Sequence, residues 1–281
     1  MLTIQEMERT ATQVRRDVLR MIHAVQSGHP GGSLGCADFL TALYFEVLLH
    51  NPKRFSMNGE GQDVFFLSNG HLSAAWYSVL ARSGYFEVSE LATFRKLNTR
   101  LQGHPTNAEG IPGVRISSGS LGQGLSVGIG AAISKKLNND PHTIFTLHGD
   151  GELQEGQIWE AAMYAAANKV DNIIATIDVN GQQIDGTVND VCSLGELKAK
   201  WVAFGWKVLE TNGNKMQNII DTLLLAKEHT GKQKPIVILM KTEMGCGVNF
   251  MAGSYKWHGT PPNDEQLEKA LQQLPVTLGD Y

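Results

Sequence analysis

The sequence predicts an α/β fold in which a parallel sheet carries helices on both faces. Short, continuously apolar segments alternate with longer segments whose apolar residues recur at helical spacing. The clearest apolar segments are 63–68, 142–150, 172–180 and 235–243. Strands that are apolar along their whole length are typical of parallel sheets buried on both faces. The alternation of strand and helix indicates the same architecture.

The elements are expected in a regular order along the chain. Residues 3–26 read as a helix, and a glycine-rich turn leads into an apolar helix within 28–49. A loop rich in glycine and proline covers 101–124. Between these lie strand 63–68, helix 72–83 and a short helix at 91–97. The remaining elements are helix 125–137, strand 142–150, helix 154–170, strand 172–180, segments 194–204 and 215–229, strand 235–243 and helix 263–273.

Composition excludes several classes of protein. The chain has 281 residues, 42% of them hydrophobic, which is enough for a substantial core. A net charge of -4 without a run of basic residues does not indicate binding to nucleic acid or to an anionic membrane. No apolar stretch reaches the roughly 18 residues of a membrane span, and the amphipathic N-terminus is not a signal peptide. Because Cys36, Cys192 and Cys246 are far apart in sequence, a reducing, cytoplasmic setting is expected.

Two polar residues end two consecutive predicted strands. Asp150 lies between Gly149 and Gly151, and Asn180 follows the next strand. The intervening helix is a crossover, so both side chains reach the same edge of the sheet. With a nearby backbone carbonyl, they form an oxygen site suited to Mg²⁺ or Ca²⁺, completed by phosphate oxygens. The flanking glycines let the backbone approach those phosphates, and the helix starting near Glu155 can direct N–H groups at the same anion.

The segments GDGELQEGQIWEA and IDVNGQQIDG resemble the thiamine-diphosphate motif, and nearly the whole chain resembles the amino-terminal part of the transketolases. The supporting motifs, which occur in the family's order and spacing, are SGHPGGSLG (27–35), SNGH (68–71), FRKLNTRLQGHP (94–105), SGSLGQG (118–124) and KWHG (256–259). The resemblance implies a thiamine-diphosphate-binding fold in which residues 1–281 form one diphosphate-binding domain.

The resemblance also implies a role for each matching residue. The divalent ion is expected on Asp150, Asn180 and the backbone carbonyl of Gln182. Contacts to the cofactor are expected from His71, Gly119, Leu121, Asp150, Gly151, Glu152, Asn180 and His258. The catalytic residues implied are His29, His104, His258 and Glu155, the last supporting the cofactor's acid network across a subunit interface. The sugar is expected to contact His29, Arg95, His104 and His258. Gln182 stands where the family commonly has an aliphatic residue, and Ser120 where it often has proline.

The histidine pattern agrees with these roles on physical grounds. In ketol transfer the cofactor supplies the electron sink, so the protein must orient it and move protons. Histidine suits proton transfer because its unperturbed pKa lies near neutrality. Five of the nine histidines lie beside glycine. Four of them fall within the matching motifs, namely His29, His71, His104 and His258, whereas His148 lies on the strand side of the turn at Gly149. The five histidines outside these motifs are expected to be structural or exposed; they are His23, His50, His142, His148 and His229.

The implied activity is transfer of a two-carbon ketol group from a ketose phosphate to an aldose phosphate, with the pentose phosphate pathway as the default setting. Transketolases carry the activating glutamate and most sugar-phosphate-binding residues in a second, pyrimidine-binding domain. No second α/β segment follows here. The sequence therefore predicts the amino-terminal subunit of a split transketolase. It is expected to be inactive without a separate chain carrying the pyrimidine and carboxy-terminal domains, in an α2β2 assembly.

Three alternatives stay open at the level of sequence. The first is the α subunit of a 2-oxo acid dehydrogenase, against which SGHPG, SNGH and KWHG favour transketolase. The second is a synthase that condenses pyruvate with a triose phosphate, whose single chain would normally include the missing domain. The third is a non-catalytic cofactor-binding protein. The presence of Asp150, Asn180 and the glycine-flanked histidines argues against a loss of the catalytic residues.

Overall fold

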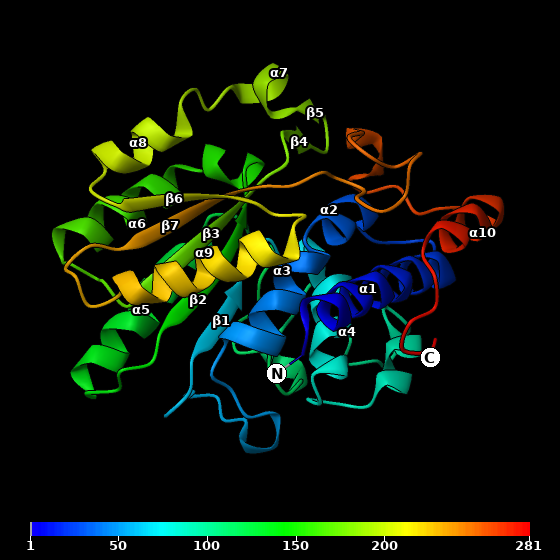
Figure 1. The fold of residues 1–281 in the computed structure, drawn as a ribbon, viewed down its shortest axis with the longest axis horizontal. Helices are drawn as coiled ribbons and strands as arrows, with labels where there is room; N and C mark the ends of the chain where they lie inside the picture. The colour runs from blue at the N-terminus through cyan, green and yellow to red at the C-terminus, as the bar shows by residue number, and fades with distance from the viewer. Residues whose placement is uncertain (1) are drawn as a thin grey trace.

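The computed structural model describes residues 2–281, and within this range the main sheet has five parallel strands (Figure 1). Their order across the sheet is β1-β2-β3-β7-β6, and every neighbouring pair is parallel. This confirms the predicted α/β class. The strands are β1 (Val64–Leu67), β2 (Ile144–Gly149), β3 (Ile173–Val179), β6 (Lys207–Asn212) and β7 (Ile236–Lys241).

Alternate side chains of the central strands enter two separate cores. In β1, for example, Phe65 packs into one core and Phe66 into the other, because successive side chains of a strand point to opposite faces. The first core is covered by α1 (Ile4–Val25), α3 (Ala37–Ala42), α4 (Ser73–Arg82) and α9 (Met216–His229). The second is covered by α5 (Gln123–Leu137), α6 (Gly156–Ala167) and α8 (Leu197–Ala203). Helices therefore cover both faces, as predicted.

The ends of the helices follow local capping chemistry. Thr3 and Glu6 form a capping box at the start of α1, and Asn263 and Gln266 do the same for α10 (Asp264–Gln273); each box satisfies backbone N–H groups that the first helical turn leaves free. The apolar helix expected within 28–49 is divided into α2 (Pro30–Gly35), α3 and a π-helical turn over Leu43–Val47.

Three local predictions need correction. The short helix expected at 91–97 is wrong, because a 3₁₀ segment, Val88–Thr93, ends before Phe94 and Arg95 then adopts a left-handed φ of 56°. Strand β6 was not predicted. The stretch after Asn180 also forms a small hairpin of β4 (Gln182–Gln183) and β5 (Gly186–Thr187), followed by α7 (Val188–Cys192).

The C-terminal tail runs back along α1 (Figure 1). Asp280 forms ion pairs with Arg16 and Arg20, and the N–H of Thr277 donates to Gln13 at 3.0 Å. The tail therefore closes the outer side of the first core. Within residues 2–281, no helix combines the length and apolarity that a bilayer crossing requires.

Candidate active site

A cavity of about 360 Å³ opens where β1, β2 and β3 end. The predicted site residues converge on it from turns that follow these strands and from loops above them. With the exception of Arg95, all of them line the cavity: His29, His71, His104, Gly119, Leu121, Asp150, Gly151, Glu152, Glu155, Asn180, Gln182 and His258. The carboxyl ends of parallel strands are where such sheets bind ligands.

Asp150 lies at the end of β2 with both carboxylate oxygens in hydrogen bonds. The N–H of Gly151 donates to Oδ1 at 2.8 Å, and the N–H of Gly181 donates to Oδ2 at 2.6 Å. Burial, followed by the neighbouring carboxylate of Asp178, raises the pKa of Asp150 to about 7 although these hydrogen bonds lower it. The carboxylate of Asp150 thus joins the turn after β2 to the turn after β3. It is poorly solvated and lies close to the carboxylate of Asp178.

Asn180 follows β3 and is held by its own neighbours. Its Nδ2 donates to Asp178 Oδ2 at 2.8 Å, and its Oδ1 accepts from the N–H of Gln182 at 2.8 Å. Asp178 is almost fully buried and also accepts a hydrogen bond from the hydroxyl of Thr242. Burial raises the pKa of Asp178.

Four of the histidines that line the cavity form one cluster. The ring centroids of His29 lie 5.2 Å from His71, 5.5 Å from His258 and 6.0 Å from His104, and those of His71 and His258 are 5.1 Å apart. Each comes from a different turn, because His29 precedes α2, His71 lies in the 3₁₀ turn Gly70–Leu72, and His258 follows the 3₁₀ turn Tyr255–Trp257.

The histidine cluster is neutral at pH 7. Burial, followed by the charge of His258, lowers the pKa of His29 to about 4. Burial also lowers the pKa of His258 and of His104, and holds that of His71 well below its ordinary value. A neutral imidazole offers one N–H donor and one acceptor nitrogen, so the wall can both give and receive protons at ligand oxygens.

Glu152 lines the cavity, but its carboxylate already has partners inside the protein. It accepts from the hydroxyl of Ser68, from the N–H of Gly122 at 2.9 Å and from the N–H of Gly149 at 3.1 Å, and it lies 3.3 Å from Nδ1 of His148. His148 is fully buried. Glu152 therefore ties together the turns after β1 and β2 and the loop before α5.

Two predicted residues lie at the margin of the site. Glu155, the N-cap residue of α6, is exposed at the rim. Arg95 does not line the cavity, because its guanidinium donates to Ser27 Oγ at 2.9 Å and to the carbonyl of Gly103 at 3.2 Å. Its positive charge still contributes to the lowered pKa of His29 and of His104.

Sequence reasoning missed several residues that shape the cavity. Asn69, Asp178, Gln183 and Met244 also line it. For Asp178 a signal existed, because it lies two positions before Asn180 and side chains at that spacing share one face of a strand. Asn69 belongs to the SNGH motif, in which only the histidine carries a predicted role.

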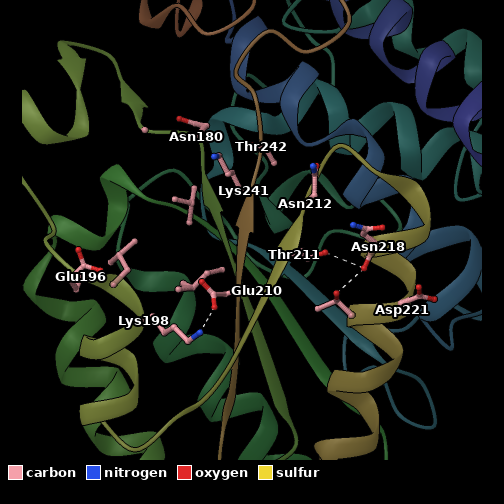
Figure 2. A pocket seen from close by; sticks show the side chains of 15 residues that line it. Asn180, Glu196, Lys198, Glu210, Thr211, Asn212, Asn218, Asp221, Lys241 and Thr242 are labelled. Atoms are coloured by element: carbon pink, nitrogen blue, oxygen red, sulfur yellow. Dashed lines mark hydrogen bonds and ion pairs between the residues drawn. The ribbon is translucent and has the colours of Figure 1, made fainter.

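A larger cavity of about 930 Å³ lies beyond Asn180, at the ends of β6 and β7 (Figure 2). Its walls carry Lys198 and Glu210, which form an ion pair with each other, and the exposed Lys241. Among the residues that the structure describes, only Asn180 lines both cavities. Asn180 thus borders both cavities.

Comparison with known proteins identifies the family. Residues 7–277 match the family described as transketolase, thiamine diphosphate binding domain. The chain belongs to the transketolase family. This match decides against the α subunit of a 2-oxo acid dehydrogenase.

Relatives of similar length are named as transketolase subunits. One subunit of the apulose-4-phosphate transketolase of Phocaeicola vulgatus is 37% identical over 273 residues, covering 97% of this chain and 95% of that protein. One subunit of the 6-deoxy-6-sulfo-D-fructose transketolase of Clostridium sp. is 36% identical over 272 residues, covering 96% of each. Human transketolase is 30% identical over 274 residues, which are 96% of this chain but 42% of that protein.

Solved transketolases share the fold. The crystal structure of transketolase from Campylobacter jejuni superposes with a TM-score of 0.89 at 36% identity, covering 97% of this chain and 43% of that chain. The Leishmania mexicana enzyme gives a TM-score of 0.87 at 29% identity, over 98% of this chain and 41% of that one. This chain therefore spans less than half the length of the solved transketolases, and the predicted thiamine-diphosphate-binding fold is confirmed.

The transketolase cavity fits a diphosphate cofactor with a divalent cation. A Cβ added at Gly149 would meet nothing closer than 4.0 Å, so a ligand can reach this stretch of backbone. Within residues 2–281, no group of three or more His, Cys, Asp or Glu forms a metal site. A cation at Asp150 therefore needs amide, carbonyl and phosphate oxygens as well. Four buried atoms of the lining residues have no hydrogen-bond partner: His29 Nδ1, Asn69 Oδ1, Gln183 Oε1 and His258 Nδ1.

Proposed function

We propose that residues 1–281 form the single diphosphate-binding domain of a two-chain transketolase. The complete enzyme transfers a two-carbon ketol group from a ketose phosphate to an aldose phosphate. The observation that carries this proposal is that Asp150 and Asn180 line one cavity together with four neutral histidines. Family membership supports the same reaction class.

Thiamine diphosphate supplies the electron sink for ketol transfer when it is bound. Asp150, Asn180 and the carbonyl of Gln182 would hold the Mg²⁺ or Ca²⁺ that accompanies it. Oxygen ligands of this kind suit either ion. The contacts proposed for the rest of the cofactor come from Gly151, Glu152, His71 and His258 near the diphosphate and from Gly119 and Leu121 near the aminopyrimidine ring.

His29, His104 and His258 are proposed to hydrogen-bond the sugar and to move protons at its carbonyl and hydroxyl oxygens. Their lowered pKa values keep them neutral, so each has an acceptor nitrogen available at pH 7. Arg95 is proposed to act from the substrate side. Held by Ser27 and Gly103, it places a positive charge near His29 and His104 and favours their unprotonated form.

The partner is proposed to be a separate carboxy-terminal chain with a pyrimidine-binding domain, assembled as α2β2. Similar-sized relatives are named as subunits, and full-length transketolases are more than twice as long as the matched region. The rim of the cavity supports a partner there, because Ile184 is 60% exposed and Glu155 is exposed beside it. The interface with the partner is proposed to lie on this rim. Glu155 is proposed to reach the cofactor's acid network across it.

The substrate class is a ketose phosphate, and the partner is proposed to select among sugars. The described residues that line the cavity include no lysine or arginine, so this chain offers no direct cation for a phosphate group. Relatives are named for apulose-4-phosphate and for 6-deoxy-6-sulfo-D-fructose. Their names indicate that subunits of this kind serve in more than one sugar pathway.

The test begins with capture of the chain from its own cells under mild conditions and identification of bound proteins by mass spectrometry. Ketol transfer is then measured for the chain alone, for the captured partner alone and for the mixture. The expected result is activity only in the mixture. Full activity of the single chain contradicts the two-chain proposal.

Cofactor binding gives an independent test. Thiamine-diphosphate binding is measured by calorimetry with and without Mg²⁺, using the assembled complex. Asp150→Ala is expected to abolish the Mg²⁺-dependent binding, because it removes the only carboxylate proposed as a cation ligand. Asp221→Ala, on the wall of the larger cavity, is expected to bind as the wild type does. Unchanged binding by the Asp150 variant would refute the cation site.

A further inference from the structure

Asn180 occupies a position where packing alone does not fix its side chain. It is half-buried and borders a cavity on either side, one of about 360 Å³ and one of about 930 Å³. Figure 2 shows the side chain at the end of its strand, near Lys241 and Thr242. An amide with room to rotate loses affinity for a cation, because ordering it costs side-chain entropy.

Hydrogen bonds hold the amide instead. Asp178 accepts from Nδ2, and the N–H of Gln182 donates to Oδ1. A carboxylate cannot donate, so Asp178 can be satisfied only by the nitrogen end of the amide. The oxygen end is thereby kept away from Asp178, where it accepts the N–H of Gln182.

Asp178 is itself held from another segment. Thr242, directly after β7, donates its hydroxyl to Oδ1. Asp178 is 2% exposed and Thr242 is 8% exposed. This hydrogen bond and the burial leave the carboxylate little freedom to turn away from Asn180.

We propose that Asp178 and Thr242 are positioning residues that fix the amide of Asn180 for the divalent cation of the cofactor site. The cation part of this inference rests on the proposed function, whereas the positioning part rests on the hydrogen bonds alone. Residues that orient metal ligands in this way commonly change affinity without touching the metal.

The variants remove the acceptor or the hydroxyl that holds it. Asp178→Leu removes the acceptor, and with it the hydrogen bonds from Asn180 and Thr242. Thr242→Val removes only the hydroxyl, with little change of volume. Thr176→Val is the matched control, because Thr176 is on β3, is 1% exposed and has a hydroxyl without a partner. Should Asp178→Leu fail to fold, Thr242→Val carries the test.

The first measurement is the order of the Asn180 side-chain amide, taken from ¹⁵N relaxation of the cofactor-free, perdeuterated chain. The resonance is assigned by its loss in Asn180→Asp. We expect a rigid amide in the wild type and in Thr176→Val, a mobile one in Asp178→Leu, and intermediate order in Thr242→Val. Equal rigidity in the folded Asp178 and Thr242 variants overturns the positioning role.

The second measurement is the Mg²⁺ concentration that half-saturates thiamine-diphosphate binding in the assembled complex. It is expected to rise about 10- to 100-fold in Asp178→Leu, less in Thr242→Val and not in Thr176→Val, with circular dichroism unchanged. No rise in either folded variant overturns the link to the cation. If the wild type shows no Mg²⁺-dependent binding, the proposed function fails, while the amide measurement still decides the positioning role.

Discussion

Gly119 lies against the imidazole of His104, in a backbone conformation with a φ of +119° that L side chains rarely adopt. A Cβ at this position would meet Cδ2 of His104 at 2.6 Å. The absence of a side chain thus serves two purposes, because it permits the turn and it lets the ring of His104 reach the cavity.

Gly119→Ala is expected to lower the free energy of unfolding by about 2–3 kcal/mol, since backbone strain and a steric clash add together. Gly110→Ala is the control, because Gly110 has a φ of +64° with nothing within 4 Å of an added Cβ. It is expected to cost only about 1 kcal/mol. Urea denaturation measures both, and equal losses would show that the contact with His104 has no steric cost.

The histidine cluster predicts how stability depends on pH. His29 has a pKa of about 4 in the folded chain and about 6.5 in the unfolded chain. Between these values the unfolded chain binds the extra proton, so the free energy of unfolding falls as the pH is lowered from 6.5 to 4. Stability from this group is fully present above pH 6.5.

His29→Asn is expected to make that decline shallower, because one of the groups responsible is removed. Urea denaturation at pH 7, 6, 5 and 4 measures the slope. His229→Asn, in the last turn of α9 and outside the cluster, serves as the comparison. A slope that is the same in the wild type and in His29→Asn would contradict the buried, neutral state of His29.

At the scale of elements, Glu152 joins segments that are far apart in sequence. Its carboxylate receives hydrogen bonds from Ser68 after β1, from Gly149 at the end of β2 and from Gly122 at the start of α5. Replacing a buried, hydrogen-bonded charge leaves its partners unsatisfied. The three turns that surround the cavity are therefore expected to loosen together when this residue changes.

Glu152→Gln is expected to cost about 2–3 kcal/mol of stability, because an amide cannot accept the same set of hydrogen bonds at both of its ends. Glu155→Gln, three residues later and exposed, is expected to stay within about 0.5 kcal/mol of the wild type. Hydrogen exchange at Gly122 and Gly149 locates the effect. If both amides keep their wild-type protection from hydrogen exchange in Glu152→Gln, Glu152 does not hold these turns together.

Strands buried on both faces were predictable, and a partly exposed strand was not. β1, β2, β3 and β7 are runs of apolar residues, and their cores on both faces explain that pattern. β6 was missed because none of its residues is fully buried and it mixes apolar residues with Lys207, Glu210 and Asn212. The segment 91–97 has a helical composition, but its backbone turns at Arg95.

The candidate site was predictable where one motif contains both the residue and the turn that orients it. Asp150, His71 and Gly119 are of this kind. Arg95 was harder, because Ser27 lies 68 positions away in sequence and yet binds its guanidinium. Asp178 was hidden within an apolar strand, and its partner Thr242 comes from a different strand.

At the scale of the whole molecule, the C-terminal tail is held to α1 largely by charge. Asp280 accepts from Nη2 of Arg16 at 2.6 Å and from Nε2 of Gln13 at 2.9 Å. The Arg16 guanidinium, with Gln13 and Arg20 beside it, holds the pKa of Asp280 below its usual range. The Asp280 carboxylate therefore stabilises the folded chain at pH values above about 3.9, the pKa of an aspartate in the unfolded chain. This contribution is lost progressively as the pH falls below that value.

Asp280→Asn is expected to cost about 1–3 kcal/mol at pH 7, the range for hydrogen bonds to charged groups. The difference in the free energy of unfolding from the wild type is expected to shrink as the pH falls below about 4, where the carboxylate of Asp280 begins to be protonated in the unfolded chain. Urea denaturation at pH 7, 5 and 3 measures it. Glu265→Gln, which breaks the exposed pair with Lys269, should have little effect at any of these values. A difference as large at pH 3 as at pH 7 would contradict the ionic account.

The order of the strands also has a consequence for folding of the chain during its synthesis. β7 is the last strand to be synthesised, yet it lies between β3 and β6 in the sheet. Until residues 236–241 have left the ribosome, β6 has no neighbour to pair with, and one side of β3 stays open. Nascent chains that stop short of this point therefore carry an exposed apolar strand edge, the kind of surface that chaperones recognise and that aggregates when synthesis stalls.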